Sequence, residues 1–257
     1  MTKIESYVQG TPSYVELTTP DQESAKRFYG GLFGWELADI PMGEAGYYVT
    51  VSVGGDAVAG ISGPMPGMDG HEAYWGVYLA VDDVDAATAR VAGAGGSVEA
   101  GPFDVMDLGR MSVVKDPTGA FVSLWQAGAS IGTERANEPG TPIWNEVITP
   151  DVPAATRFYS EVLGVTWEDQ PMGEGPAYTC LVVDGRQVGG AMRPQMDGVP
   201  AHWNVYFNVA SVDDTIARAT ELGGTVVAPA FDVPGVGRMA VLADPQGAAF
   251  NLMQAPS

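Results

Sequence analysis

The stretch PSYVELTTPD at residues 12–21 returns as PIWNEVITPD at residues 142–151, 130 residues later. The proline, the glutamate and the Thr-Pro-Asp turn keep their places, whereas Tyr14 is replaced by Trp144. In both copies an alternating run typical of a strand meets a turn whose aspartate can cap the start of a helix. A repeat of this kind decides the fold, because it predicts two copies of one structural unit.

The repeat extends over almost the whole chain. RFYGGLFGW at 27–35 matches RFYSEVLGV at 157–165, and after a two-residue deletion VDAATARVAGAGG at 84–96 matches VDDTIARATELGG at 212–224. Two homologous domains are therefore predicted, residues 1–130 and 141–257, joined by a Gly-, Asn- and Pro-bearing linker at 131–140. A length of 257 residues suits two such domains.

Each domain divides again into two units with the same order of elements. In the first unit a strand and a helix ended by Gly34 precede three strands, so strands are expected at 14–18, 35–39, 46–53 and 57–62. The second unit repeats this order, with a helix at about 84–92 and strands at 74–81, 97–100, 110–115 and 120–126. The prediction is an α+β fold with two βαβββ units in each domain.

Composition limits the partners. A net charge of −20 repels nucleic-acid phosphates and anionic lipid surfaces, so neither is expected as a partner. Cys180 is the one cysteine, which excludes an intrachain disulfide and fits a reducing compartment. No apolar run approaches the roughly 18 residues that span a bilayer, and the first residues do not resemble a signal peptide, so a cytoplasmic location is expected.

The order of elements, with TPDxxxAxRFYxxxxG early and DPxGA late in each domain, resembles the vicinal oxygen chelate superfamily. This superfamily contains glyoxalase I, extradiol dioxygenases, and the fosfomycin and bleomycin resistance proteins. The FDVxxxGRMxVxxDPxGA stretch is most similar to its two-domain glyoxalase-like "hydroxylase" subgroup. The resemblance implies that each domain forms a curved eight-stranded sheet around a cavity. In the family's enzymes, His from the first strand of each unit and Glu from the last strand hold a divalent metal there.

The family's ligand slots, transferred residue by residue, fall on Tyr14, Gly76, Ser123, Trp144, Asn204 and Asn251. None of these side chains readily binds Zn²⁺, Fe²⁺ or Ni²⁺. Of the two histidines, His71 aligns with a loop, whereas His202 is two residues from Asn204 and so shares its face of the strand. His202 and Glu146 supply only two ligands. No cofactor is therefore predicted, and a divalent metal at that pair is kept as the alternative.

Every second residue along a strand shares a face with the ligand slot on that strand. The residues selected in this way predict an aromatic surface with several hydrogen-bonding groups, as expected for binding a flat, partly apolar small molecule. Its members are Tyr14, Glu16, Tyr74, Gly76, Tyr78, Phe121, Ser123 and Trp125, and in the second domain Trp144, Glu146, His202, Asn204, Tyr206, Asn208, Asn251 and Met253. For Tyr14 and Trp144, filling of a vacated metal site is an equal alternative to ligand stacking. Trp75 and Trp203 are expected on the opposite face, against the helices.

Glu16 and Glu146 are the candidate catalytic residues if the chain is an enzyme. Burial on an inner strand face would raise the pKa of either carboxyl group and suit it to acid or base chemistry. The alternative is a structural role, in which each carboxylate pairs with an arginine such as Arg110 or Arg238 or is hydrogen-bonded at the domain interface.

Three functions remain open from the sequence. The first is metal-independent binding of an aromatic small molecule, such as a natural product or antibiotic, for sequestration, resistance or delivery to a biosynthetic enzyme. The second is a glyoxalase, lyase or hydroxylase reaction that uses a pocket glutamate or an unconventional metal site. The third is an interaction or antigenic protein with vestigial pockets. Because two fused domains can imitate a dimer of single domains, either a monomer or a homodimer is expected.

Overall fold

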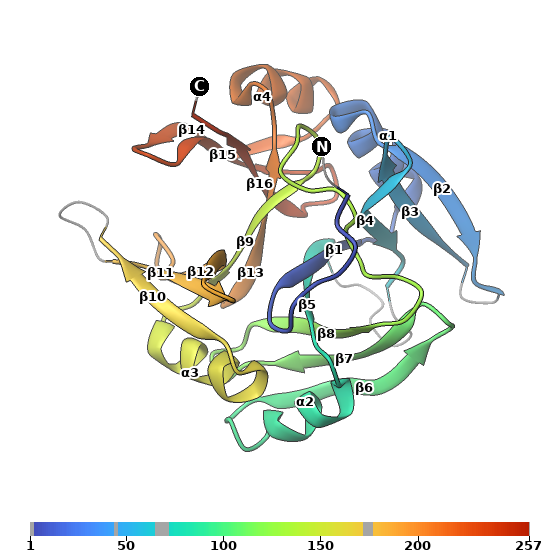
Figure 1. Ribbon diagram of the computed structural model, residues 1–257. Helices are drawn as coiled ribbons and strands as arrows, with labels where there is room; N and C mark the ends of the chain where they lie inside the picture. Colours follow the sequence, from blue (N-terminus) through green and yellow to red (C-terminus); the bar gives the residue numbers. More distant parts are fainter. Residues whose placement is uncertain (1–2, 44–45, 65–71, 172–176, 257) are drawn as a thin grey trace.

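The computed structural model describes residues 3–43, 46–64, 72–171 and 177–256, and these contain two eight-stranded sheets and four helices (Figure 1). The elements of the first half are β1(Pro12–Thr18), α1(Gln22–Phe33), β2(Glu36–Pro41), β3(Tyr47–Val53), β4(Asp56–Ser62), β5(Tyr74–Ala80), α2(Val84–Val91), β6(Ser97–Val105), β7(Gly109–Lys115) and β8(Phe121–Ala127). Those of the second half are β9(Pro142–Ile148), α3(Val152–Leu163), β10(Thr166–Gln170), β11(Tyr178–Val183), β12(Arg186–Met192), β13(His202–Asn208), α4(Val212–Glu221), β14(Thr225–Val233), β15(Gly237–Ala243) and β16(Ala249–Gln254).

The two sheets have the same topology. The first has the order β2-β3-β4-β1-β5-β8-β7-β6 and the second the order β10-β11-β12-β9-β13-β16-β15-β14. In each, the first strands of the two units lie side by side and antiparallel, as β1 and β5 do, and each of them pairs in parallel with the last strand of its own unit. The predicted α+β fold of paired βαβββ units is confirmed. The sheets are open and curved, with β2 and β6 at the edges of the first.

The Thr-Pro-Asp turn acts as the sequence predicts. The Asp21 side chain accepts a hydrogen bond from the Ser24 backbone N–H at 2.9 Å and so caps α1, and Asp151 caps α3 in the same way. Gly34 ends α1 in the left-handed conformation, with φ of 70°, which glycine adopts without the steric cost of a Cβ atom. Both copies of the motif therefore begin and end their helices at equivalent residues.

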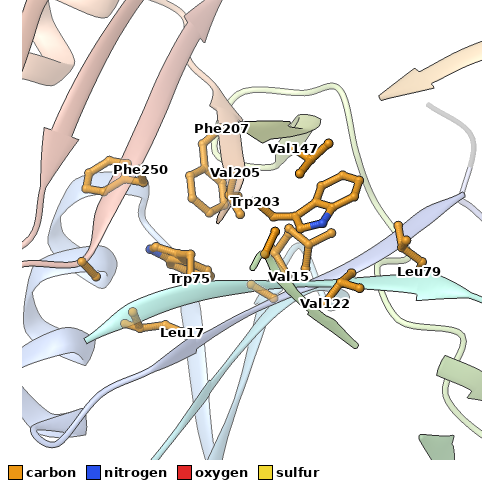
Figure 2. Close-up of a cluster of buried hydrophobic side chains, with 14 of the residues drawn as sticks. Val15, Leu17, Trp75, Leu79, Val122, Val147, Trp203, Val205, Phe207 and Phe250 are labelled. Atoms are coloured by element: carbon orange, nitrogen blue, oxygen red, sulfur yellow. The ribbon is translucent and has the colours of Figure 1, made fainter. Parts of the chain in front are cut away.

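Alternation along β1 separates two faces. Val15 and Leu17 are fully buried in a hydrophobic core, whereas Tyr14 and Glu16 lie on the opposite face, called the inner face below. The core is continuous between the two halves of the chain. In Figure 2 side chains from both sheets, such as Trp75 and Phe207, pack in one cluster. The centres of these two rings lie 5.1 Å apart. The face of each sheet opposite its inner face, which carries residues such as Val15 and Leu17, is called the outer face. The two sheets pack against each other through their outer faces, so their inner faces point away from each other.

A buried hydrogen-bond chain crosses between the halves. Trp75 Nε1 donates to the Tyr29 hydroxyl at 2.9 Å, and this hydroxyl donates to Asp244 Oδ2 of the other half at 3.0 Å. A second chain related by the repeat runs through Trp203, Tyr159 and Asp116. The helices also pair across the boundary, α1 with α4 and α2 with α3 (Figure 1). Trp75 and Trp203 thus face the helices, as predicted, and both are interface residues.

The segment predicted as a linker packs closely against the first sheet. The Thr133 N–H donates to the Ser13 carbonyl, and the Glu134 N–H donates to the Ala57 carbonyl, both at 2.7 Å. Thr133 is 3% exposed, so this part of the segment is ordered by backbone hydrogen bonds and burial. Within the described residues, no helix is both long and apolar enough to cross a membrane.

Candidate functional site

The inner face of the first sheet is centred on Glu16 of β1. Ser62, at the end of β4, donates its hydroxyl to Glu16 Oε1 at 2.9 Å, and Tyr48 and Tyr78 also hydrogen-bond to this carboxyl group. The Tyr14 hydroxyl lies 3.0 Å from that of Tyr48. Glu16, Tyr14, Tyr48, Ser62 and Tyr78 are called the first carboxyl site.

The second sheet has an equivalent arrangement around Glu146. Tyr178 donates to Glu146 Oε2 at 2.7 Å, and Tyr206 donates a short hydrogen bond to Oε1. Trp144 Nε1 donates to the Tyr178 hydroxyl at 2.8 Å, and Asn204 also hydrogen-bonds to the carboxyl group. Glu146, Trp144, Tyr178, Asn204 and Tyr206 are called the second carboxyl site.

Burial dominates the electrostatics of both sites. Desolvation raises the pKa of Glu16 and of Glu146, and the hydroxyl hydrogen bonds offset part of that rise because they favour the ionised form. Desolvation, the first and largest cause, also raises the pKa of Tyr48, Tyr78 and Tyr206, and the nearby glutamate raises it further. The phenols therefore remain protonated at neutral pH and act as hydrogen-bond donors.

The structural role through an arginine, considered from the sequence, is wrong for both glutamates. Arg110 pairs with Asp85 and Asp104 at 2.8 and 2.9 Å, and Arg238 makes the equivalent pairs with Asp213 and Asp232. FDV and GRM belong to the β6–β7 hairpin and its counterpart β14–β15, and cross-strand pairing sets Arg110 opposite Asp104. Hydroxyl groups, joined at Glu146 by the Asn204 side chain, hydrogen-bond to the two carboxyl groups in place of guanidinium groups.

The structure brings most of the predicted surface residues to the inner faces, but with unequal exposure. Tyr74 and Phe121 lie at the rim, 41% and 52% exposed, and the Lys115 ammonium stands 5.4 Å from the centre of the Phe121 ring. Ser123 is half-buried. Trp125 is buried and donates its indole N–H to the Ser130 carbonyl at 3.0 Å.

The second inner face is more enclosed. Asn208, Asn251 and Met253 are all less than 10% exposed, and Asn251 Nδ2 donates to the Val205 carbonyl at 3.2 Å. His202 is half-buried, with Nε2 3.0 Å from Asn204 Oδ1 and Nδ1 2.8 Å from the Pro200 carbonyl. The structure thus ties His202 to Asn204 rather than to Glu146. His71 lies outside the described residues.

Sequence reasoning missed Tyr48, Tyr178 and Ser62. Alternation identifies inner-face residues only on the strands that carry ligand slots, and these three residues lie on β3, β11 and β4. A signal was present, because Tyr48 and Tyr178 are retained at the repeat offset of 130 residues while the residues before them change.

A pocket of about 260 Å³ lies beside the first inner face, where β5 and β8 end. It is lined by Ser6, Tyr7, Ala80, Val81, Asp82, Trp125, Gln126, Ala127 and Ile131. It shares Trp125 with the predicted surface but contains no member of the first carboxyl site. The first carboxyl site is therefore separate from this pocket.

Two family models match the chain. Residues 11–124 match the Glyoxalase/Bleomycin resistance protein/Dioxygenase superfamily, and residues 145–253 match the Glyoxalase-like domain. The chain belongs to the glyoxalase/bleomycin resistance/dioxygenase superfamily. The resemblance read from the Thr-Pro-Asp and Asp-Pro-x-Gly-Ala motifs is confirmed.

Curated relatives in this superfamily align over nearly their full length. CFP32 of Mycobacterium tuberculosis, whose name describes it as a candidate glyoxylase, is 47% identical over 99% of this chain and 98% of its own. The anthracycline biosynthesis protein DnrV of Streptomyces peucetius is 37% identical over 96% of this chain and 94% of its own.

Solved structures show the same fold at low identity. The Mn(II)-bound glyoxalase from Novosphingobium aromaticivorans matches with a TM-score of 0.66 and 19% identity, over 96% of this chain and 83% of its own. The 2,3-dioxygenase LapB from Pseudomonas sp. KL28 matches with a TM-score of 0.64 and 15% identity, over 98% of this chain and 94% of its own.

The superfamily's metal does not fit the side chains at the corresponding positions. In the second sheet the Trp144 and Asn251 N–H groups are donors, committed to Tyr178 and to the Val205 carbonyl. In the first sheet Tyr14 is a phenol whose pKa burial raises, Gly76 has no side chain, and Ser123 is a neutral hydroxyl. Among the described residues, no group of three His, Cys, Asp or Glu side chains is placed to hold a metal. Neither sheet offers the anionic or imidazole donor set that such a metal requires.

Proposed function

We propose that the chain binds an aromatic, partly apolar small molecule on its inner face without a metal, for sequestration, resistance or assistance to a biosynthetic enzyme. The observation that carries this proposal is the occupation of the ligand slots by aromatic and neutral polar side chains gathered around a glutamate. Such a surface offers stacking and hydrogen bonds together, the combination that orients flat ligands. In the first domain the proposed contacts are Tyr14, Glu16, Tyr74, Tyr78, Ser123 and Trp125.

Two further observations support this ligand class. DnrV and DauV, 37% identical to this chain, are named for the biosynthesis of anthracyclines, which are polycyclic aromatic molecules. The net charge of −20 and the carboxyl group at the centre of the site disfavour an anionic ligand. A neutral or cationic hydroxyaromatic molecule fits these constraints best.

A titration calorimetry experiment tests the proposal with 1,8-dihydroxyanthraquinone as a neutral probe. We expect saturable binding to the native chain and about five-fold weaker binding to Tyr78→Phe, which removes a hydrogen bond worth about 1 kcal/mol that holds the Glu16 carboxyl group in place. Arg110→Gln, which changes a surface ion pair in the same half, is the matched control and should bind as the native chain does. Equal affinity in Tyr78→Phe, or no saturable binding by the native chain, would contradict the proposal.

A second candidate function is acid or base catalysis by Glu16 in a glyoxalase, lyase or hydroxylase reaction. The favouring observation is a carboxyl group of raised pKa that keeps part of its surface exposed on an inner face. Glu16→Gln keeps the shape but cannot exchange a proton. Any turnover found for the native chain should fall by at least about 100-fold in this variant, and unchanged turnover would eliminate Glu16 as the acid or base.

A further inference from the structure

The two carboxyl sites differ in access to solvent although the repeat relates them residue by residue. Glu146 is 3% exposed and Tyr206 is 9% exposed, so both are buried. Their counterparts Glu16 and Tyr78 are only half-buried.

The same asymmetry holds elsewhere on the inner faces. Thr50 is exposed on β3, whereas its counterpart Cys180 on β11 is 4% exposed. Ser123 is half-buried on β8, whereas its counterpart Asn251 on β16 is 4% exposed. The difference therefore extends beyond the glutamate, whereas Trp144 and Tyr178 are half-buried like their counterparts Tyr14 and Tyr48.

Side-chain chemistry accounts for the closure. Small polar residues on the first inner face are replaced by apolar ones on the second, since Thr18 corresponds to Ile148, Ser52 to Val182 and Ser62 to Met192. Ile148 and Val182 are each 7% exposed, whereas Thr18 and Ser52 are half-buried.

The second carboxyl site, like the first, has its hydrogen bonds satisfied from within, but Glu146 is 3% exposed whereas Glu16 is half-buried. Each oxygen of Glu146 accepts from one tyrosine, and Tyr178 in turn accepts from the Trp144 indole. A ligand would have to break these buried bonds, and each broken bond leaves a donor or acceptor unpaired at a cost of about 1–3 kcal/mol.

We propose that ligand enters only the first inner face, and that the second carboxyl site is a closed structural centre. This inference rests on the proposed function and adds to it that the chain has one binding site, at Glu16. The ligand is one that offers a hydroxyl or ammonium donor to the Glu16 carboxylate and an aromatic surface to Tyr14 and Tyr78.

Thiol reactivity tests this asymmetry without any ligand. Cys180 is the chain's one cysteine and lies on the second inner face, so the native chain reports on that face unchanged. Ser123→Cys in a Cys180→Ala background reports on the first, and Thr50→Cys in the same background is a second reporter there. Each alkylation rate by iodoacetamide is normalised to the rate of the same chain unfolded in urea.

We expect the native fold to slow alkylation of Cys180 by at least about 100-fold, and that of the two first-face reporters by less than about 10-fold. Equal protection of the two faces, or faster alkylation of Cys180, would overturn the proposal. Saturating 1,8-dihydroxyanthraquinone should slow alkylation at Ser123→Cys and leave Cys180 unchanged, and slowing at Cys180 alone would also overturn it. A probe that binds neither face contradicts the proposed function, while the alkylation ratio still decides between one open face and two.

Discussion

At the residue scale, the change from Tyr14 to Trp144 preserves a hydrogen bond. Tyr14 meets the Tyr48 hydroxyl at 3.0 Å, and Trp144 donates to the equivalent Tyr178 hydroxyl at 2.8 Å. Both aromatic residues occupy the slot where the superfamily's enzymes would keep a metal ligand, and both hold a tyrosine that hydrogen-bonds to the glutamate. Each of the two residues therefore belongs to a hydrogen-bond network around a carboxyl group.

Alternation could predict that Glu16, Tyr14 and Tyr78 share a face, because side-chain direction along a strand follows from position alone. It could not predict Tyr48, because its approach to Glu16 depends on the pairing of β3 with β4 and of β4 with β1. Nor could alternation predict that Glu146 is buried and Glu16 only half-buried, because burial depends on residues from many strands.

Removal of one tyrosine hydroxyl should affect the two halves differently. Tyr206→Phe leaves a buried oxygen of Glu146 without its donor, so we expect the free energy of unfolding to fall by about 1–3 kcal/mol. Tyr78→Phe should cost less, because water can reach the half-buried Glu16. Urea denaturation of both variants measures the difference, and an equal loss in the two would argue against the unequal access of the two sites.

The pH dependence of stability should carry the signature of Glu146. Its pKa in the folded chain lies above the ordinary value of 4.5, so between these two values the folded chain binds more protons than the unfolded chain. Glu146 therefore makes its full contribution to the free energy of unfolding below about pH 4.5. That contribution declines as pH rises through the pKa of Glu146 in the folded chain, by at most about 1.4 kcal/mol per pH unit.

Glu146→Gln cannot titrate and should lack that decline. The difference in unfolding free energy between the native chain and this variant, measured by urea denaturation from pH 4 to pH 8, should move in favour of the variant as pH rises. A constant difference would show that the folded pKa of Glu146 is not raised.

At the element scale, glycine on β4 and β12 makes room for the tyrosines. A Cβ atom at Gly60 would overlap the Tyr48 hydroxyl, and one at Gly190 would overlap the Tyr178 hydroxyl. Each glycine pairs with the glutamate of its own site in the parallel ladder, Gly60 with Glu16 and Gly190 with Glu146. The absence of a side chain at these two glycines therefore determines where the tyrosine hydroxyl lies.

Alanine at these glycines should displace the tyrosine ring. We expect Gly190→Ala to destabilise the chain by about 1–3 kcal/mol, because the buried second site cannot relax freely. Gly60→Ala should mainly weaken binding of 1,8-dihydroxyanthraquinone. Gly185→Ala is unsuitable as a control because its φ is positive, so Gln187→Ala, an exposed position on β12, serves for comparison of expression and folding. Unchanged stability in Gly190→Ala would mean that the Tyr178 ring does not lie over this residue.

The sequence predicted the strands closely except at β6, which was expected at 97–100 and continues to Val105. Pro102 interrupts the pattern, since proline cannot donate to a ladder and usually ends a strand. β6 is an edge strand with a register shift between Ala100 and Phe103, and edges and bulges are where a sheet tolerates proline. That tolerance depends on the strand's place in the sheet, which local sequence does not contain.

At the scale of the whole molecule, one core joins the two halves. The repeat predicted two similar sheets, but nothing in their alternation specified that α1 would pair with α4 or that Tyr29 would reach Asp244. These contacts depend on how one half docks on the other. The halves should therefore unfold together, because the helices of each half cover only part of its outer face and the other half covers the rest.

Tyr29→Phe tests this dependence. The change removes the hydroxyl that joins Trp75 to Asp244, so we expect a single unfolding transition at lower temperature, with a loss of about 1–3 kcal/mol. Tyr159→Phe should behave alike. Tyr47→Phe, which breaks an exposed bond to Glu23, is the control and should change little. Two separate transitions in calorimetry would contradict a shared core.

The most direct test of the central claim is a calorimetric titration of the native chain with 1,8-dihydroxyanthraquinone, with and without metal. One sample is freed of metal by EDTA and dialysis, and the other is supplied with Mn²⁺. Binding on an inner face without a metal predicts the same affinity in both samples and loss of affinity in Glu16→Gln. Binding that appears only with Mn²⁺ would contradict it.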